Sequence, residues 1–276
     1  MNDLFSCVSD EERILGSVPL IHRVLMVPVC FLALVLGSEQ RSWADAADNR
    51  ADSKVRLDAS EIPAGVPRLT VLVNGIPCGV QGAWSTSANT WRYHFEYNDK
   101  GHGPWLDETV TVGLDKIPLS IRLTGHDYFE HRVAEEYSRI GRSVTWHNGT
   151  SQGSRSSTSS MFYLTEPNVP GQLSAVPEEL AMLAQALIAS SRDRIALLPH
   201  GEARMDRAGH VRVSIPGNEE TLEAVRISTL RSEAAELWLS RDGTLFAASE
   251  GPLMLIRRGW ESALSQLRSR KATAGP

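Results

Sequence analysis

The sequence predicts an α+β fold: a strongly curved antiparallel β-sheet with one largely buried helix and one amphipathic helix at the C-terminal end. Short runs of alternating apolar and polar residues, separated by turn residues, recur from Arg68 to about Glu250, which is typical of half-buried strands. One segment, Glu178–Ser190, instead carries its apolar residues at helical spacing. Helices do not alternate with strands, which excludes a Rossmann or TIM-barrel fold.

Composition and charge narrow the class of protein. The chain has 276 residues, 42% of them hydrophobic, and a formal net charge of -5. This balance is ordinary for a globular core and excludes a disordered acidic tail, a collagen-like fibre and a disulfide-dense miniprotein. Because no basic excess is available to neutralise phosphates, we expect no nucleic-acid partner.

The N-terminal region has the features of an export signal. Val24–Gly37 is an uncharged apolar run that follows Arg23 and precedes Ala44-Asp45-Ala46, as in a secretory signal peptide with an A-x-A cleavage site. The run is shorter than the roughly 20 residues that span a bilayer, which favours cleavage. The alternative is an uncleaved transmembrane helix that anchors the chain to the inner membrane through residues 14–37. We therefore expect residues 1–46 to be a signal peptide or N-terminal membrane anchor, and the protein to be exported to the periplasm.

The rest of the chain divides into a linker, one domain and a tail. Residues 47–67 are polar and small and predict a linker. Residues 68–267 hold the predicted strands and helices and form the antiparallel-sheet domain, and the charged residues 268–276 predict a flexible tail. Cys78 alone remains after removal of the signal, so we expect a buried, inert thiol.

The first half of the domain consists of predicted strands. Leu69–Val73 ends at Asn74-Gly75, a strong hairpin signal. Trp91–Tyr97 alternates strictly, with its aromatic residues on one face and Arg, His and Glu on the other, as in a half-buried antiparallel strand. The Ser- and Gly-rich residues 148–160 predict an exposed loop. Further strands are expected at residues 106–112, 118–124, 133–140, 143–147 and 161–164.

The helix predicted over Glu178–Ser190 is apolar on most sides. Pro177 suits its first turn, and Glu178 and Glu179 suit the positive end of the helix dipole. Since little polar surface remains, we expect the helix to be buried in the concave face of the curved sheet.

The second half of the domain is again predicted to be strands, followed by a terminal helix. Arg241-Asp242-Gly243 predicts the last hairpin turn. The amphipathic helix is expected over Ile256–Leu267, with Arg257 and Glu261 as an i,i+4 ion pair. The strands are expected at residues 194–198, 201–205, 211–215, 222–229, 236–240 and 244–248.

Two residue patterns suggest chemistry but lack the context that it requires. Gly149–Gly153 matches the G-x-S-x-G pattern of serine hydrolases, but a Ser-rich loop follows Ser151 where a helix is needed. His126, Asp127, Glu130 and His131 are potential metal ligands, but a spacing of five places the two histidines on opposite faces of a strand. We therefore assign no catalytic, cofactor-binding or metal-binding residue from the sequence, and expect no cofactor.

Several segments resemble, in order, the N-terminal region of a group of bacterial exported metal-dependent amidohydrolases. Phe95–Pro104 is similar to the FxYNDRGRGP segment of this family, with His102 in place of an arginine. The other similar segments are Gly125–Tyr128, Pro177–Ala181, Leu197–Arg204, Leu237–Ala247 and Ile256–Glu261, the last two resembling the family's WLDxDGxLFA hairpin and IREGWE helix.

The resemblance implies an accessory domain without a reaction centre. In that family this region precedes the catalytic barrel, whose H-x-H motif and other metal ligands lie downstream of the IREGWE segment. No position of this chain matches a catalytic residue of the family. The resemblance therefore implies a non-catalytic scaffold, a split or truncated form whose partner is an amidohydrolase barrel subunit and which has no catalytic activity by itself.

Three alternatives remain. The chain acts as a hydrolase of C–N bonds only together with a separate barrel domain, or it is an independent hydrolase that uses Ser151 or the pair His126 and His131. The third is a periplasmic binding module for an apolar small molecule. An open cavity lined by Trp91, Tyr93, Phe95 and Leu183 would favour this module, whereas a filled core favours the scaffold.

Overall fold

The computed structural model describes residues 59–156, 160–167, 172–229 and 232–271. All of them belong to one compact unit within Ala46–Pro276. The predicted signal peptide or anchor, residues 1–46, lies outside the described residues. In the predicted linker, Ala59 and Ile62 are buried against Val80 on the outside of the sheet.

The prediction of a transmembrane helix needs correction. Among the residues that the structure describes, no helix has the length and the apolar character needed to cross a membrane. Residues 14–37, on which that prediction fell, are not among them.

The first half of the fold is a run of antiparallel hairpins, each strand pairing with the next. The β1–β2 connection turns at Asn74-Gly75, as the sequence predicts. The strands are β1 (Arg68–Val73), β2 (Ile76–Ser87), β3 (Thr90–Tyr97), β4 (Trp105–Val112), β5 (Pro118–His126), β6 (Arg132–Ile140), β7 (Ser143–His147) and β8 (Gln152–Ser156).

The second half begins with a single β–α–β unit and continues as hairpins. Strand β9 pairs in parallel with β10, and helix α2 lies between them in the chain; all other pairs in this half are antiparallel. The elements are β9 (Met161–Tyr163), α2 (Glu178–Ser190), β10 (Arg194–Leu198), β11 (Glu202–Ile215), β12 (Asn218–Thr229), β13 (Ser232–Leu239), β14 (Leu245–Glu250) and β15 (Leu253–Arg257).

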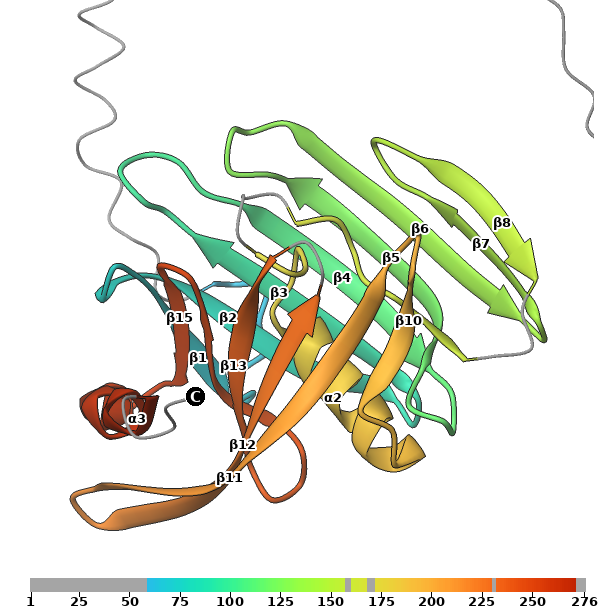
Figure 1. The fold of residues 1–276 in the computed structure, drawn as a ribbon. Helices are drawn as coiled ribbons and strands as arrows, with labels where there is room; N and C mark the ends of the chain where they lie inside the picture. The colour runs from blue at the N-terminus through green and yellow to red at the C-terminus, as the bar shows by residue number, and fades with distance from the viewer. Residues whose placement is uncertain (1–58, 157–159, 168–171, 230–231, 272–276) are drawn as a thin grey trace, which may run out of the picture. The chain divides into compact units, whose positions relative to one another are not determined.

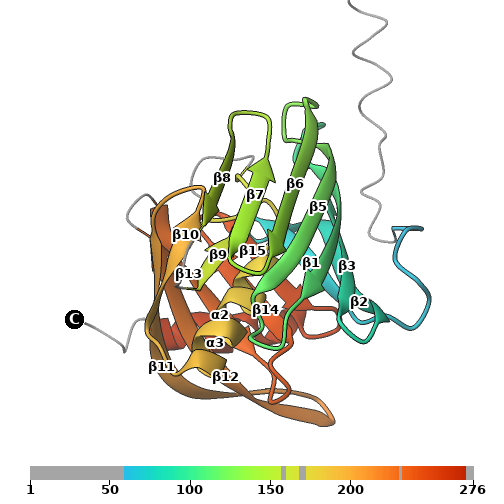
Figure 2. The same ribbon diagram turned by 90° about the vertical axis from the view of Figure 1, so that its right-hand side faces the viewer.

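The two halves form one sheet because the first and last strands pair. Strand β1 pairs antiparallel with β15, with Thr70 opposite Ile256. The sheet of fifteen described strands therefore runs from β8 through β1 and β15 to β9, and it is not closed. It curves around α2, which is enclosed by strands of both halves (Figures 1 and 2).

The predicted α+β class is wrong, because the fold is nearly all β. Strands account for 58% of the described residues and helix for 11%. The chain end holds a 3-10 turn, η1 (Glu261–Ala263), and a short helix, α3 (Leu264–Lys271). The helix predicted over Ile256–Leu267 therefore begins only at Glu261, because Ile256 and Arg257 belong to strand β15, a buried apolar segment that was not predicted as a strand. Glu261 accordingly accepts a hydrogen bond from Thr70 (2.6 Å) and does not pair with Arg257.

Two more differences from the predicted strands have local causes. The predicted loop 148–160 contains β8, an edge strand of polar residues that offers no apolar alternation to detect. The two strands predicted at 201–205 and 211–215 form one continuous β11, which is interrupted only by a bulge between Arg207 and Gly209.

Helix α2 is confirmed where the sequence predicts it, and it fills the concave side of the sheet. Its residues Leu180, Leu183 and Leu187 are each 0% exposed. The helix ends at Ser191, whose left-handed backbone (φ +52°) lets the N–H of Arg192 donate to the carbonyl oxygen of Leu187 at 3.2 Å. The packing therefore depends on a helix without a polar face.

The outer face of the second half carries a smaller core. There α3 and η1 cover the sheet, and Trp260 packs edge-on against Phe246 with ring centroids 5.2 Å apart. Because these strands are covered on both faces, they are rich in consecutive apolar residues.

Truncating a buried side chain of α2 tests this arrangement. Leu183→Ala should lower the free energy of unfolding by about 2–5 kcal/mol, because a cavity remains in a close-packed interior. The matched control is Leu114→Ala: Leu114 is 99% exposed, so the change should stay within about 0.5 kcal/mol. Urea unfolding followed by circular dichroism measures both. Equal effects of the two substitutions would contradict the buried position of α2.

Candidate functional site

Ser151 lies in the turn of the β7–β8 hairpin. Its backbone N–H and its hydroxyl both donate to Oδ1 of Asn148, at 2.6 and 3.2 Å. A strand follows the turn, whereas the nucleophile of a serine hydrolase projects from a strand-to-helix turn. In this geometry Ser151 is a turn-forming residue.

The side chains of the four potential metal ligands, His126, Asp127, Glu130 and His131, do not converge on a common point. Oδ2 of Asp127 lies 3.0 Å from Nδ1 of His131, and its Oδ1 accepts two backbone N–H groups of the same loop at 2.8 Å each. His126 instead stacks on Trp105, with ring centroids 6.3 Å apart, and Glu130 is exposed. Within the described part of the chain, no group of three or more His, Cys, Asp or Glu residues could hold a metal ion.

The interior of the sheet is packed with side chains. Tyr93, Phe95 and Leu183 are 4%, 0% and 0% exposed and belong to one core cluster, against which Trp91 packs. Cys78 lies in the same cluster, as expected, and burial raises the pKa of its thiol to about 11, which makes it a poor nucleophile. The residues proposed to line a cavity therefore form a filled core.

Five glutamates gather around the first turn of α2, and we call them the glutamate cluster. Glu178 and Glu179 belong to α2, Glu108 to β4, Glu135 to β6 and Glu250 to β14. Glu108, Glu135, Glu179 and Glu250 are at most 4% exposed. Burial raises the pKa of every member, to about 8 for Glu135 and to about 7 for Glu178 and Glu250.

The strand register explains how distant glutamates meet. Glu108 stands opposite Leu123 of β5, and Leu123 stands opposite Glu135 of β6. Tyr93 of β3 stands opposite Glu108 on its other side. These four residues form one row across the concave face, which the N-terminal turn of α2 faces.

Three of these carboxyl groups hold the irregular segment between β9 and α2. The N–H of Thr165 donates to Glu179 (3.2 Å), and that of Leu173 donates to Glu250 (3.1 Å). The N–H of Glu166 donates to Glu135 (3.1 Å). Buried backbone groups outside helices and strands need such partners, so the cluster has a structural role.

Glu108 and Glu179 are two buried carboxyl groups that influence each other's ionisation. Neither oxygen of Glu108 receives a hydrogen bond from a donor group of the described residues, and the same is true of Oε1 of Glu179. Two buried carboxylates that face the same interior repel each other unless one of them is protonated. Burial and then the charge of Glu179 raise the pKa of Glu108 well above its usual value, which favours the protonated form of Glu108.

A charged histidine lies on the other face of β3. His94 is 0% exposed, and its Nδ1 lies 3.0 Å from Asp107 while its Nε2 lies 3.7 Å from Glu96. Burial alone would lower the pKa of His94, but the two carboxylates raise it to about 9. His94 is therefore protonated and paired at neutral pH.

One end of the first half carries a surface of aromatic and histidine side chains. The rings of His102 and Tyr128 stack at 5.7 Å, Tyr128 meets Phe129 edge-on at 5.2 Å, and Phe129 lies 6.2 Å from His131. Phe129 is 60% exposed. We call these four residues the aromatic–histidine surface; it is built from the β3–β4 and β5–β6 connections.

Two glycines allow these connections to approach closely. A Cβ atom on Gly103 would overlap the carbonyl oxygen of Tyr97, and one on Gly125 would overlap the carbonyl oxygen of Trp105. Both positions also have positive φ angles, +158° and +148°. The segments Phe95–Pro104 and Gly125–Tyr128, which carry part of the family resemblance, thus meet in space.

The glutamate cluster was missed from the sequence, although the alternation of two strands contains a signal for it. Glu108 falls in register with the apolar Leu106 and Val110, and Glu135 falls in register with Val133 and Tyr137. A carboxylate at an apolar position of an alternating strand predicts a buried, protonated acid.

The pH dependence of stability tests the protonation of the cluster. Folding raises these pKa values from 4.5 to about 7 or 8, so the stabilisation is complete below pH 4.5 and is lost as the pH rises through 7 to 8. The free energy of unfolding should fall by a few kcal/mol between pH 5.5 and 8.5, measured by urea unfolding. A stability that rises or stays constant over this range would contradict the assignment.

His94 also has a raised pKa, so its deprotonation likewise lowers the stability as the pH rises. Replacing Glu108 with its neutral isostere glutamine distinguishes the contribution of Glu108 from that of His94. Glu108→Gln should weaken the pH dependence, because the amide copies the protonated acid and cannot ionise. The control is Glu136→Gln, next to Glu135 on the solvent face of β6 with its side chain 71% exposed; it should leave the pH dependence unchanged.

Comparison with known proteins identifies no family. No family model matches the sequence, and no curated protein matches it at a significant level. Among solved structures, the chain is similar to a beta-barrel-like protein of a domain of unknown function, DUF1849, from Brucella abortus. The match has a TM-score of 0.43 and 8% sequence identity, and it covers 70% of this chain and 95% of that chain. We draw no functional conclusion from it.

Proposed function

We propose that the chain is an exported, non-catalytic accessory domain that packs against a metal-dependent amidohydrolase barrel. The proposal starts from the ordered resemblance of six segments to the N-terminal region of such enzymes. These segments lie within one sheet unit, and two of them meet at the aromatic–histidine surface.

The filled interior is the observation that favours a scaffold over a carrier of apolar ligands. Phe95 and Leu183 are each 0% exposed within one continuous core, so the concave side of the sheet is occupied by α2. A carrier needs a cavity that buries most of its ligand. A scaffold needs a stable core and an outward surface, which agrees with this packing.

The aromatic–histidine surface is the part best suited to contact the barrel. Exposed aromatic rings that are held by stacking provide large contact area with little loss of conformational freedom, and such residues dominate binding energy at protein interfaces. Phe129 is more exposed than Tyr128, with 60% of its surface accessible. His102 and His131 flank the rings with polar groups.

Co-purification tests the proposal. The tagged mature chain, expressed in its native host, should retain a stoichiometric protein that mass spectrometry identifies as a barrel with an H-x-H motif. Recovery of a monomeric chain without such a barrel would overturn the proposal. Amide hydrolysis by the assembly, and by neither component alone, would assign the joint C–N hydrolase.

A pair of substitutions locates the contact. Phe129→Ala should weaken binding of the barrel about 30-fold, corresponding to a hot-spot residue of about 2 kcal/mol. The control Leu114→Ala removes another exposed apolar side chain, 99% exposed, from the β4–β5 turn at the opposite end of the strands. Equal losses would place the contact elsewhere.

A further inference from the structure

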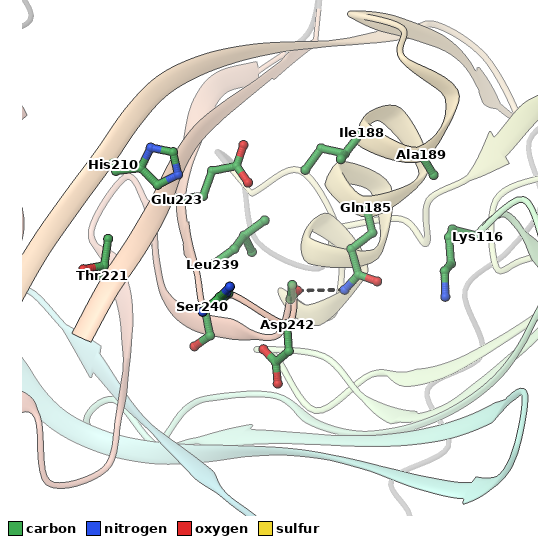
Figure 3. A pocket seen from close by; sticks show the side chains of 12 residues that line it. Lys116, Gln185, Ile188, Ala189, His210, Thr221, Glu223, Leu239, Ser240 and Asp242 are labelled. Carbon is green, nitrogen blue, oxygen red and sulfur yellow. Dashed lines mark hydrogen bonds between the residues drawn. The ribbon is translucent and has the colours of Figure 1, made fainter. Parts of the chain in front are cut away.

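A pocket of about 620 Å³ opens at the C-terminal end of α2, and we call it the terminal pocket. It lies between the last turns of α2, the β4–β5 turn, the β11–β12 hairpin and the β13–β14 turn (Figure 3). Its volume is within the range of small-molecule sites, about 300–1,000 Å³. It is separate from both the glutamate cluster and the aromatic–histidine surface.

One wall of the terminal pocket is apolar. This wall is formed by Ile188 and Ala189 of α2 and by Leu239 of β13. Nε2 of Gln185 donates to the carbonyl oxygen of Gly243 at 2.7 Å, which ties the helix to the β13–β14 turn (Figure 3). This bond fixes the relative position of two walls before any ligand arrives.

The carboxylates of the pocket already have partners. Glu223 lies 3.3 Å from the guanidinium of Arg207. Oδ1 of Asp242 accepts hydrogen bonds from the N–H (3.1 Å) and the hydroxyl (2.8 Å) of Thr244. Glu223 is therefore ion-paired and Asp242 is hydrogen-bonded within the protein.

Two cationic side chains at the pocket, in contrast, are not engaged in ion pairs with described residues. Lys116 and Arg241 are exposed, and neither forms an ion pair with another residue that the structure describes. The acidic neighbour of Lys116 is engaged elsewhere, since Asp115 binds Arg139 through two hydrogen bonds of 2.9 and 3.0 Å. The pocket thus combines an apolar wall with available positive charge.

The position of Lys116 is fixed by its turn. Its backbone is left-handed (φ +62°), and its N–H donates to the carbonyl oxygen of Gly113 at 3.0 Å. The bidentate pair of Asp115 with Arg139 links this turn to β6. A turn held at both points fixes the backbone from which the lysine side chain extends beside the pocket.

We infer that the terminal pocket binds a small amphipathic organic anion. Its carboxylate or phosphate head would lie between Lys116 and Arg241, and its short apolar tail against Ile188, Ala189 and Leu239. Arginine suits both head groups because its planar guanidinium can donate two parallel hydrogen bonds. The site does not depend on the proposed contact with a barrel.

Calorimetric titration with four eight-carbon probes tests the inference. Octanoate or octyl phosphate should bind saturably, and the stronger of the two identifies the head group. Octanol should bind at least 10-fold more weakly, and octylamine should not bind. Saturation by octanol at the same affinity, or no saturable binding of either anion, would overturn the inference.

Substitutions then locate the site. The double substitution Lys116→Gln and Arg241→Gln should weaken binding of the anion at least 10-fold. Ala189→Trp should weaken binding by occupying the space beside the apolar wall where the tail would lie, and this position is exposed, so the fold should persist. The control Arg122→Gln removes an exposed arginine of β5, with a side chain 74% exposed, and should leave the affinity unchanged. Unaltered affinity in the double variant would contradict the site.

Discussion

The fold depends on the burial of one helix that has no polar face. Leu180, Leu183 and Leu187 of α2 are inaccessible to solvent, so the helix can exist only inside a curved sheet that covers it on most sides. Its first turn brings Glu178 and Glu179 into the same interior. Isolated carboxylates are very costly in such a place, and the protein meets this cost with protonation and with hydrogen bonds to backbone N–H groups. The glutamate cluster and the filled core are therefore two aspects of one arrangement.

Because the interior is filled, the two proposed binding regions lie at the ends of the strands. In an antiparallel series, successive connections alternate between the two ends, so the β3–β4 and β5–β6 connections lie together, whereas the β4–β5 turn lies at the other end. The aromatic–histidine surface occupies the first end and the terminal pocket borders the second. A protein contact at one end and an organic anion at the other would not compete for the same residues. The two proposals can accordingly fail separately.

Much of the local structure could be predicted from the sequence, because alternation and helical spacing report burial directly. The helix over Glu178–Ser190 and the turn at Asn74-Gly75 are examples. The α+β class was wrong because the helix expected over Ile256–Leu267 is reduced to the 3-10 turn η1 and the short α3, while Leu253–Arg257, to which no strand was assigned, adds β15 to the sheet. The glutamate cluster escaped notice because it depends on register across three strands, although Glu108 stands in an apolar position of its own strand. The pairing of β1 with β15 and the terminal pocket are long-range features for which a single sequence carries no local signal.

The central claim is that the carboxyl group of Glu108 is protonated inside the folded domain at neutral pH. Infrared spectroscopy tests it directly, since a protonated carboxyl has a C=O stretch distinct from that of a carboxylate. The account predicts a protonated-carboxyl band at pH 7 that decreases in Glu108→Gln and remains in Glu136→Gln. The absence of such a band from the folded protein at pH 7, or its persistence at full intensity in Glu108→Gln, would contradict the account.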